Sequence, residues 1–375
     1  MNDLSRNGDD FDTAQAFARC QVARDWLGGA FACALPVHYS GAPFTMKVTG
    51  HPPETASVVR EVFKPAFRLL ERMSQGKILV DDRWGGNVHA ERDGAAALRD
   101  GRTDFTPCYS GWDSATYRLA QGLRLPGLFA SAEIATAISE ELYPEFFRAD
   151  VERQGIVMGR MKATSAFHLF SMRPIRAPSD LLGLRVGSND GIEGSVIRAL
   201  GAVPVPLSSL EKQQAFAVGS VDAMHISDGP AEVFGIGTAA RYRTALGLVR
   251  NNTEFGMSLS FWRNLPNDLQ RILHAWLRAE AQAECQVFYG LEGARARDKF
   301  RAAGCEFIQF SADDQAQTAA HVAPVVGDFV AAEEAAGRPA AAMIAAFKAL
   351  TAKYRDKTPD QLMSDAISNP VLYDQ

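Results

Sequence analysis

The sequence predicts an α/β protein of about two lobes built on doubly wound sheets. Its 375 residues exceed one typical domain, and hydrophobic residues make up 47% of them, which is enough for sizeable cores. Short strand patterns alternate with helical ones, as is typical of α/β folds. The clearest unit runs from Arg173 to Ala202, where a proline-bearing loop, a buried strand, a small-residue turn and a helix follow one another.

This unit predicts a ligand cleft. The strand pattern over Leu184–Val186 precedes the small-residue turn Gly187–Asn189, and helical apolar spacing resumes at Ile192. The turn therefore lies at the carboxyl end of a strand, which is where open α/β sheets bind their ligands.

The first lobe opens with a β–α–β pattern. Residues Phe44–Thr49 alternate like a strand, and Ala56–Met73 carry apolar side chains at helical spacing. Glycine-bearing turns separate the elements that follow, which indicates a doubly wound lobe. These elements are a strand at Ile78–Val80, a helix at His89–Arg99, a strand at Asp104–Cys108 and a helix at Ala132–Phe147.

The carboxyl-terminal part is rich in alanine after about Asp328. Met343, Ile344, Phe347 and Leu350 follow helical spacing within it. This spacing favours one or two packed helices over a flexible tail.

Six motifs, taken in sequence order, resemble the solute receptors of tripartite ATP-independent periplasmic (TRAP) transporters. The central motif has two parts, RPIRAPSDLLGLRVG and, at the end of the predicted helix, ALGAVPVPL. The resemblance covers roughly residues 44–330. The other matching segments are SQGKILVD (74–81), ALRDGRTDF (97–105), LRLPGLF (123–129), GSVDAMHIS (219–227) and FWRNLPNDLQRIL (261–273).

The resemblance implies how the two lobes are connected. The chain should cross near Lys162–Phe170 and return near Leu246–Phe255, and a helix from Pro266 to about Ala296 should span both lobes. The implied organisation is a leader or cryptic signal at 1–43, lobe I at 44–163 plus 250–285, lobe II at 164–249 plus 286–330, and a helical extension at 331–375.

The resemblance also implies the function. A protein of this kind captures a small organic solute in the cleft between its lobes, closes by a hinge motion and delivers the solute to the membrane subunits of a TRAP permease. It needs no cofactor and catalyses no reaction.

Composition excludes several other partners. The net charge of −5 and the pI of about 5.9 predict no basic surface for nucleic acid or anionic lipid. The five cysteines are scattered and include no C-x-x-C pair, so neither a disulfide framework nor a zinc site is expected. No segment reaches the roughly 18 apolar residues of a membrane span.

The amino terminus differs from an ordinary secretory signal. The first twenty residues are polar and acidic, and the nearest apolar run is WLGGAFACA at Trp26–Ala34, after Arg19 and Arg24. Small residues at Ser40–Ala42 are candidate cleavage positions. We favour a cryptic signal and periplasmic location, and the alternative is an amphipathic or disordered leader on a cytoplasmic protein.

The candidate site departs from the family pattern at three positions. Aligned without gaps, Gly187 stands where the family usually carries an arginine, and Ala166 stands where a second arginine often lies. Ile226 lies near the position where asparagine is common. Arginine grips a carboxylate through two charge-assisted hydrogen bonds, so these departures predict a ligand that is at most singly anionic.

Five polar residues are candidates for replacing the lost contacts. Arg185 lies on the same strand face as the missing arginine and is the first candidate charge partner, unless it is a solvated surface residue. Arg160 and Lys162 precede the crossing and are alternative cations. His225 and Asp228 lie at the carboxyl end of the strand in GSVDAMHIS, where they either face the cleft or cap a turn or helix.

Four aromatic residues predict the body of the ligand. Trp84 lies in a glycine-bearing turn, Tyr109 and Trp112 lie in the loop after the third strand, and Phe255 lies near the return crossing. Because the YSGWDS loop has little core to join, we expect its rings to face the cleft. The predicted ligand is a small organic acid with an aromatic or aliphatic body.

Two other classes share this framework. An enzyme is disfavoured because the sequence lacks G-x-S-x-G, G-x-x-x-x-G-K-[ST], H-E-x-x-H and a dinucleotide fingerprint after the first strand. The glycines around Ile192 open a helix that suits an anion, but Glu193 would repel that anion. A cytoplasmic sensor on the same fold remains the alternative that fits the unusual amino terminus.

Overall fold

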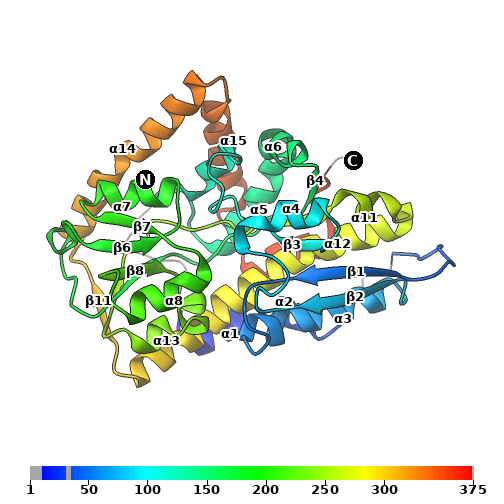
Figure 1. Ribbon diagram of the computed structural model, residues 1–375, viewed down its shortest axis with the longest axis horizontal. Coiled ribbons are helices and arrows are strands. Elements are labelled where there is room, and N and C mark those ends of the chain that lie inside the picture. Colours follow the sequence, from blue (N-terminus) through cyan, green and yellow to red (C-terminus); the bar gives the residue numbers. More distant parts are fainter. Residues whose placement is uncertain (1–10, 31–34, 374–375) are drawn as a thin grey trace.

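The computed structural model describes residues 11–30 and 35–373 of the chain. It contains two separate sheets, one in each lobe, with helices packed against both (Figure 1). This arrangement confirms the two-lobed α/β architecture.

The sheet of lobe I has five strands in the order β2-β1-β3-β10-β4. Its first three strands are parallel, as the β–α–β pattern predicted, and β10 runs antiparallel to β3 and β4. Strand β10 joins this sheet from much later in the chain, which requires a second crossing between the lobes. The strands are β1 Phe44–Thr49, β2 Ile78–Arg83, β3 Phe105–Pro107, β4 Ile156–Arg160 and β10 Phe255–Ser258.

The sheet of lobe II has six strands in the order β11-β9-β5-β8-β6-β7. Strands β6, β7 and β8 are parallel, whereas β5 runs antiparallel to β8 and β9. The strands are β5 His168–Ser171, β6 Arg185–Ser188, β7 Val203–Pro206, β8 Ala223–Ile226, β9 Tyr242–Ala245 and β11 Glu306–Gln309.

The helices of lobe I follow the predicted spacing with two irregularities. The helix expected over 56–73 begins with a wide π-type turn, η1, and the helix expected over 132–147 ends with another, η4. The helical elements are η1 Val59–Phe63, α3 Lys64–Met73, η2 Glu91–Asp93, α4 Gly94–Arg99, η3 Leu119–Arg124, α5 Ala132–Leu142, η4 Tyr143–Phe147, α6 Arg148–Arg153 and α11 Leu259–Asn264.

In lobe II, α8 begins at a complete capping box, in which Ser208 and Glu211 each bond the other's backbone amide. This cap fixes the start of α8 and therefore which of its side chains face inward. The helical elements of this lobe are η5 Pro178–Leu181, α7 Ile192–Ala199, α8 Ser209–Ala217, α9 Asp228–Val233 and α10 Ile236–Ala239.

Two extended segments connect the lobes, one between β4 and β5 and the other between β9 and β10. They run side by side and share backbone hydrogen bonds. The amide of Thr164 donates to the carbonyl of Asn251 over 2.8 Å, and the amide of Thr253 donates to the carbonyl of Lys162 over 2.7 Å. The crossings therefore form a two-stranded ribbon at the predicted hinge.

A long helix spans both lobes, as the resemblance implied. It consists of α12 Asn267–Glu284, the wide segment η6 Cys285–Glu292 and α13 Gly293–Ala302, without interruption. Its first part packs against β4 of lobe I, and its last part packs against α9 of lobe II.

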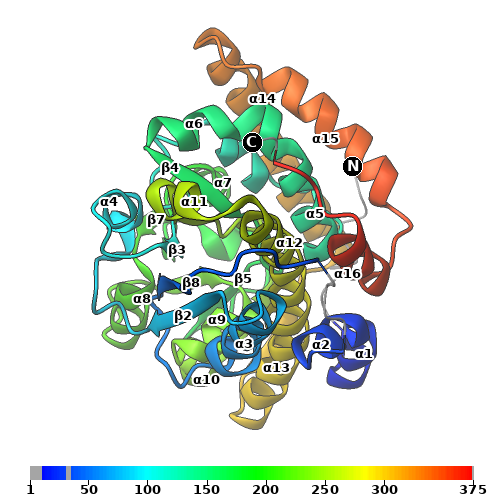
Figure 2. The same ribbon diagram turned by 90° about the vertical axis from the view of Figure 1, so that its right-hand side faces the viewer.

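The carboxyl-terminal region forms three helices, α14 Ala312–Ala335, α15 Ala340–Tyr354 and α16 Pro359–Ser368. Helix α14 packs on α7 of lobe II, whereas α15 and α16 pack on α5 of lobe I (Figure 2). Met343 and Phe347 are buried, as their helical spacing predicted.

Two short helices precede the first strand, α1 Thr13–Arg19 and α2 Gln21–Leu27. Helix α2 packs against α3, α12 and α16, and Trp26 is only 1% exposed within the core of lobe I. The predicted apolar signal segment includes Trp26 and Leu27, but its residues 31–34 lie outside the described residues. The assignment of 1–43 as a leader stays a prediction.

Across the two described ranges, every helix is too short or too polar to cross a bilayer.

Candidate ligand-binding site

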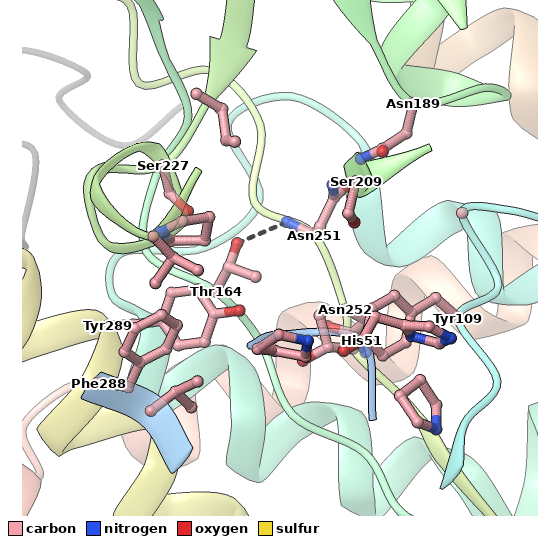
Figure 3. Close-up of a pocket in the computed structure, with 18 of the residues that line it drawn as sticks. His51, Tyr109, Thr164, Asn189, Ser209, Ser227, Asn251, Asn252, Phe288 and Tyr289 are labelled. Atoms are coloured by element: carbon pink, nitrogen blue, oxygen red, sulfur yellow. Dashed lines mark hydrogen bonds between the residues drawn. The ribbon is translucent and has the colours of Figure 1, made fainter. Parts of the chain in front are cut away.

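A cavity of about 110 Å³ lies between the two sheets (Figure 3). Residues one or two positions after five strands line it: His51 after β1, Trp84 after β2, Tyr109 after β3, Asn189 after β6 and Ser227 after β8. The carboxyl ends of the parallel strands in both sheets therefore converge on one cavity, as open α/β sheets arrange their ligand sites.

All four aromatic residues predicted at the site line this cavity, namely Trp84, Tyr109, Trp112 and Phe255. The ring centroids of Tyr109 and Trp112 lie 4.2 Å apart, and both side chains come from the loop after β3. The structure thus brings the predicted rings together on the lobe I side. Their contact with a ligand stays a prediction.

Five further aromatic residues of the lining were not predicted: Phe63, Phe167, Phe234, Phe288 and Tyr289. Phe167 lies at the end of the first crossing and Phe234 directly follows α9, whereas Phe63 lies in η1 and Phe288 and Tyr289 lie in η6 of the spanning helix. A π-type turn shifts the side-chain positions that follow it, and such turns are frequent at functional sites. For Phe63, Phe288 and Tyr289, helical spacing alone indicates a core position, because it carries no signal for a wide turn.

The hinge supplies part of the cavity wall. Thr164 comes from the first crossing, and Asn251, Asn252 and Thr253 come from the second. The amide of Asn251 donates to Oγ1 of Thr164 over 3.0 Å (Figure 3). Any motion of one lobe against the other therefore moves residues that face the cavity.

Two buried cations line the cavity, Arg124 and Lys212, and neither was predicted from the sequence. Burial lowers the pKa of each side chain. Lys212 lies on the same buried face of α8 as Ala215 and Phe216, at positions i, i+3 and i+4. A lysine on an otherwise apolar helix face was the signal that could have identified it.

Arg124 is held in place by neutral acceptors. Its Nε donates to Oδ1 of Asn251 over 3.0 Å, its Nη1 donates to Oγ of Ser110 over 2.8 Å, and its Nη2 donates to the carbonyl of Asn252 over 3.2 Å. Ser110 in turn donates to Glu254 over 2.6 Å. The guanidinium thus fastens the second crossing segment to lobe I.

His51 presents a polar atom without a partner. It is 4% exposed, it packs edge-on against Trp112, and its Nε2 has no hydrogen-bond partner among the described residues. Burial, with a smaller effect of His89, lowers the pKa of His51 to about 4. The imidazole is therefore neutral at pH 7 and can accept or donate one hydrogen bond toward the cavity.

We expect His51 to make the folded protein sensitive to mild acid. The unfolded histidine, with an ordinary pKa near 6.5, binds a proton that the folded one resists, so His51 contributes stability above pH 6.5 that is lost as the pH falls toward 4. The difference in free energy of unfolding between wild type and His51→Gln should fall by up to about 3 kcal/mol between pH 7 and pH 4. Urea unfolding of both proteins measures it, and a pH-independent difference would contradict the assignment.

Arg160 and Lys162 lie in a buried charge cluster behind the aromatic wall. Arg160 contacts Glu280 and Glu284 of α12, and Lys162 contacts Glu284 at 2.5 Å. Of these four residues, Glu284 lines the cavity. The structure therefore places both predicted cations beside the site, where they join the crossing segment to the spanning helix.

His225 and Asp228 lie inside lobe II and not in the cavity lining. Nδ1 of His225 lies 2.9 Å from a carboxylate oxygen of Glu193, and Asp228 pairs with Arg243 and Arg297. Although burial opposes ionisation, the two arginines and a nearby histidine hold the pKa of Asp228 well below its usual value. Over residues 11–30 and 35–373, no group of three or more His, Cys, Asp or Glu residues is placed to hold a metal ion.

Arg185 is not brought to the cavity. It is an exposed residue on β6, where its guanidinium bonds both carboxylate oxygens of Asp222 at 3.1 Å and the carbonyl of Gly219 at 3.0 Å. At Gly187, two residues further along β6, an added Cβ would lie 2.7 Å from the side chain of Met224. An arginine could therefore stand at this position only if the Met224 side chain moved.

Comparisons with known proteins agree with this architecture. Residues 50–333 match the model of the bacterial extracellular solute-binding protein family 7. The chain is 25% identical over 296 residues to the C4-dicarboxylate-binding periplasmic protein DctP of Rhodobacter capsulatus, covering 76% of this chain and 84% of that protein.

Two solved structures show the same fold. One is a marine metagenome TRAP solute-binding protein specific for aromatic acids, in complex with 3-hydroxybenzoate, with a TM-score of 0.77, 19% identity and coverage of 84% of this chain and 100% of the other. The second is a TRAP solute-binding protein from a Bradyrhizobium species in complex with galacturonate, with a TM-score of 0.71, 19% identity and coverage of 82% and 100%.

The family match spans most of the chain, and the two sheets, the crossings and the spanning helix are those of the solved receptors. The family lies outside the cytoplasm and is non-enzymatic, which resolves the alternative of an enzyme on the same framework. The chain belongs to family 7 of the bacterial extracellular solute-binding proteins, the solute receptors of TRAP transporters.

Proposed function

We propose that this protein is a periplasmic receptor for a small organic acid with one carboxylate and a ring-bearing body, which it delivers to a TRAP permease. The observation that carries the proposal is the composition of the interlobe cavity. Nine aromatic rings of Phe, Tyr and Trp line it, together with two buried cations and a strip of amide and hydroxyl groups from the hinge. Apolar walls with a few placed polar groups are typical of small-molecule sites.

The size of the cavity supports a compact ligand. Its volume of about 110 Å³ is near the roughly 150 Å³ of an engineered protein cavity that binds benzene. A single ring with a short acidic substituent is therefore the class that fits best. The relatives are bound to an aromatic acid in one case and to a sugar acid in the other, and both ligands carry one carboxylate.

Contacts across the cleft support a closing mechanism. The amide of Ser209 in lobe II donates to a carboxylate oxygen of Glu91 in lobe I over 2.8 Å, and Ser114 of lobe I lies 3.3 Å from Asp190 of lobe II. A ligand that contacts both lobes favours the conformation in which these contacts form. The permease would then recognise the closed receptor through surfaces that the open one does not align.

A thermal-unfolding screen tests the ligand class. We expect benzoate and 3-hydroxybenzoate to stabilise the protein more than galacturonate, succinate or malate, with neutral polyols giving no shift. A bound acid supplied at a concentration of about 100 times its dissociation constant should add roughly 2.7 kcal/mol to the free energy of unfolding. Preference for succinate or malate, or for an uncharged polyol, would contradict the proposal.

A further inference from the structure

We propose that Lys212 is the group that binds the carboxylate of the ligand. The inference rests on the proposed function, and it assigns the charge recognition to a residue on α8 of lobe II. The positions where the family resemblance would place arginines are occupied by Ala166 and Gly187. The cation must therefore come from elsewhere in the lining.

The two cations of the lining differ in how fully their donors are used. All three nitrogens of Arg124 donate to groups of the protein, which uses three of the five N–H donors of the guanidinium and fixes its orientation. The ammonium of Lys212 makes a single hydrogen bond, from Nζ to Oδ1 of Asn189 over 2.9 Å. An ammonium carries three donors, so two donors of Lys212 remain for a ligand.

The acidic neighbours of Lys212 have other partners. Glu193 accepts hydrogen bonds from Nδ2 of Asn189 and Nδ2 of Asn251, at 2.9 and 3.2 Å, and lies 2.9 Å from Nδ1 of His225. A carboxylate oxygen of Glu91 accepts a hydrogen bond from the backbone amide of Ser209. Both carboxylates lower the energy of the charged lysine from a distance, but neither forms a direct ion pair with it.

Lys212 is thus a 5% exposed side chain that faces the cavity and lacks a paired anion. A buried ammonium is costly unless a counter-charge is supplied, and the ligand carboxylate supplies it. Asn189 holds Nζ by its amide oxygen, so the ammonium is positioned before the ligand arrives.

The position of Lys212 also couples binding to closure. The lysine projects from lobe II, whereas Trp84, Tyr109 and Trp112 belong to lobe I. A ligand whose ring packs on these aromatic side chains and whose carboxylate bonds Lys212 joins the two lobes. Charge recognition and closure then depend on the same contact.

Calorimetric titration of benzoate and of its uncharged analogue benzamide tests the assignment. In Lys212→Met we expect benzoate affinity to fall by at least about tenfold, while benzamide affinity changes by less than about threefold. Lys212→Arg keeps the positive charge and should bind benzoate more tightly than Lys212→Met. Circular dichroism and the unfolding midpoint establish that each variant is folded.

Arg124→Met is the matched control at the other cation. Because Arg124 holds the hinge, its loss should weaken benzoate and benzamide to a similar extent. If Arg124→Met selectively loses benzoate while Lys212→Met does not, the charge partner is Arg124 and the inference is overturned.

Failure of this inference is distinguishable from failure of the proposed function. Wild-type protein that binds benzoate, with equal affinity in Lys212→Met, overturns only the role of Lys212. Wild-type protein that binds neither benzoate nor any other carboxylate of the thermal screen overturns the proposed function, and the inference falls with it.

Discussion

Arg160→Met should lower the free energy of unfolding by about 3–5 kcal/mol, because it removes one partner of a buried ion cluster. Arg160 is fully buried, and its guanidinium contacts Glu280 and Glu284 while lying 4.2 Å from the ring centroid of Phe255. Without it, Glu284 keeps its contact with Lys162, whereas Glu280 loses its contact with a cation. Urea unfolding followed by circular dichroism measures the loss.

Arg185→Met is the matched control, since the same substitution there removes an exposed pair. The Arg185 side chain is 48% exposed, and surface ion pairs contribute about 0–1 kcal/mol, so this variant should be nearly as stable as wild type. Adding Glu280→Met to Arg160→Met should recover part of the loss, because it removes one uncompensated anion. Equal stability of the two single variants would show that the cluster does not hold the crossing segment to the spanning helix.

Trp26→Ala should be comparably destabilising, by about 3–5 kcal/mol, because it empties a large buried site. Trp26 packs in the core of lobe I together with side chains of α3, the spanning helix and α16. The other large buried tryptophan, Trp276, would test more than packing, because its indole also donates a hydrogen bond to the carbonyl of Ala66. The expected loss at Trp26 is therefore one of packing alone.

The control for this variant is Phe17→Ala on the neighbouring helix, where the side chain is 41% exposed. We expect this change to cost under about 1 kcal/mol. Both variants are compared in the full chain of 375 residues by chemical denaturation. A Trp26→Ala protein as stable as Phe17→Ala would mean that α1 and α2 contribute nothing to the folded lobe.

Local periodicity was sufficient for most of the architecture. The strand at Phe44–Thr49 has the predicted bounds. The strand near Leu184–Val186 appears as β6, which extends through Gly187 and Ser188 of the predicted turn, so that only Asn189 of that turn lines the cavity. Such patterns record which face of each element is buried, which is a local property. The wide turns η1 and η6 escaped prediction because a shift of one residue within a helix leaves its apolar spacing almost unchanged.

The charged groups of the site depended on contacts distant in the sequence. Arg185 has the residue type expected to bind a ligand carboxylate, but it forms an ion pair with Asp222 at the surface. Lys212 has the residue type usual on a surface, but the register set by the cap of α8 turns it toward Asn189 and the cavity. A charged side chain takes its role from its partners, and the sequence does not display those partners side by side.

The sequence by itself therefore determined the two-lobed α/β fold, the receptor family and the aromatic loop after the third strand. Those features follow from hydrophobic periodicity and from motifs that each lie within a short segment. Only the tertiary structure decided which cations face the cavity and which belong to the hinge. The reason is physical: the energy of a buried charge depends on the groups packed around it, and here those groups come from elements distant in the sequence.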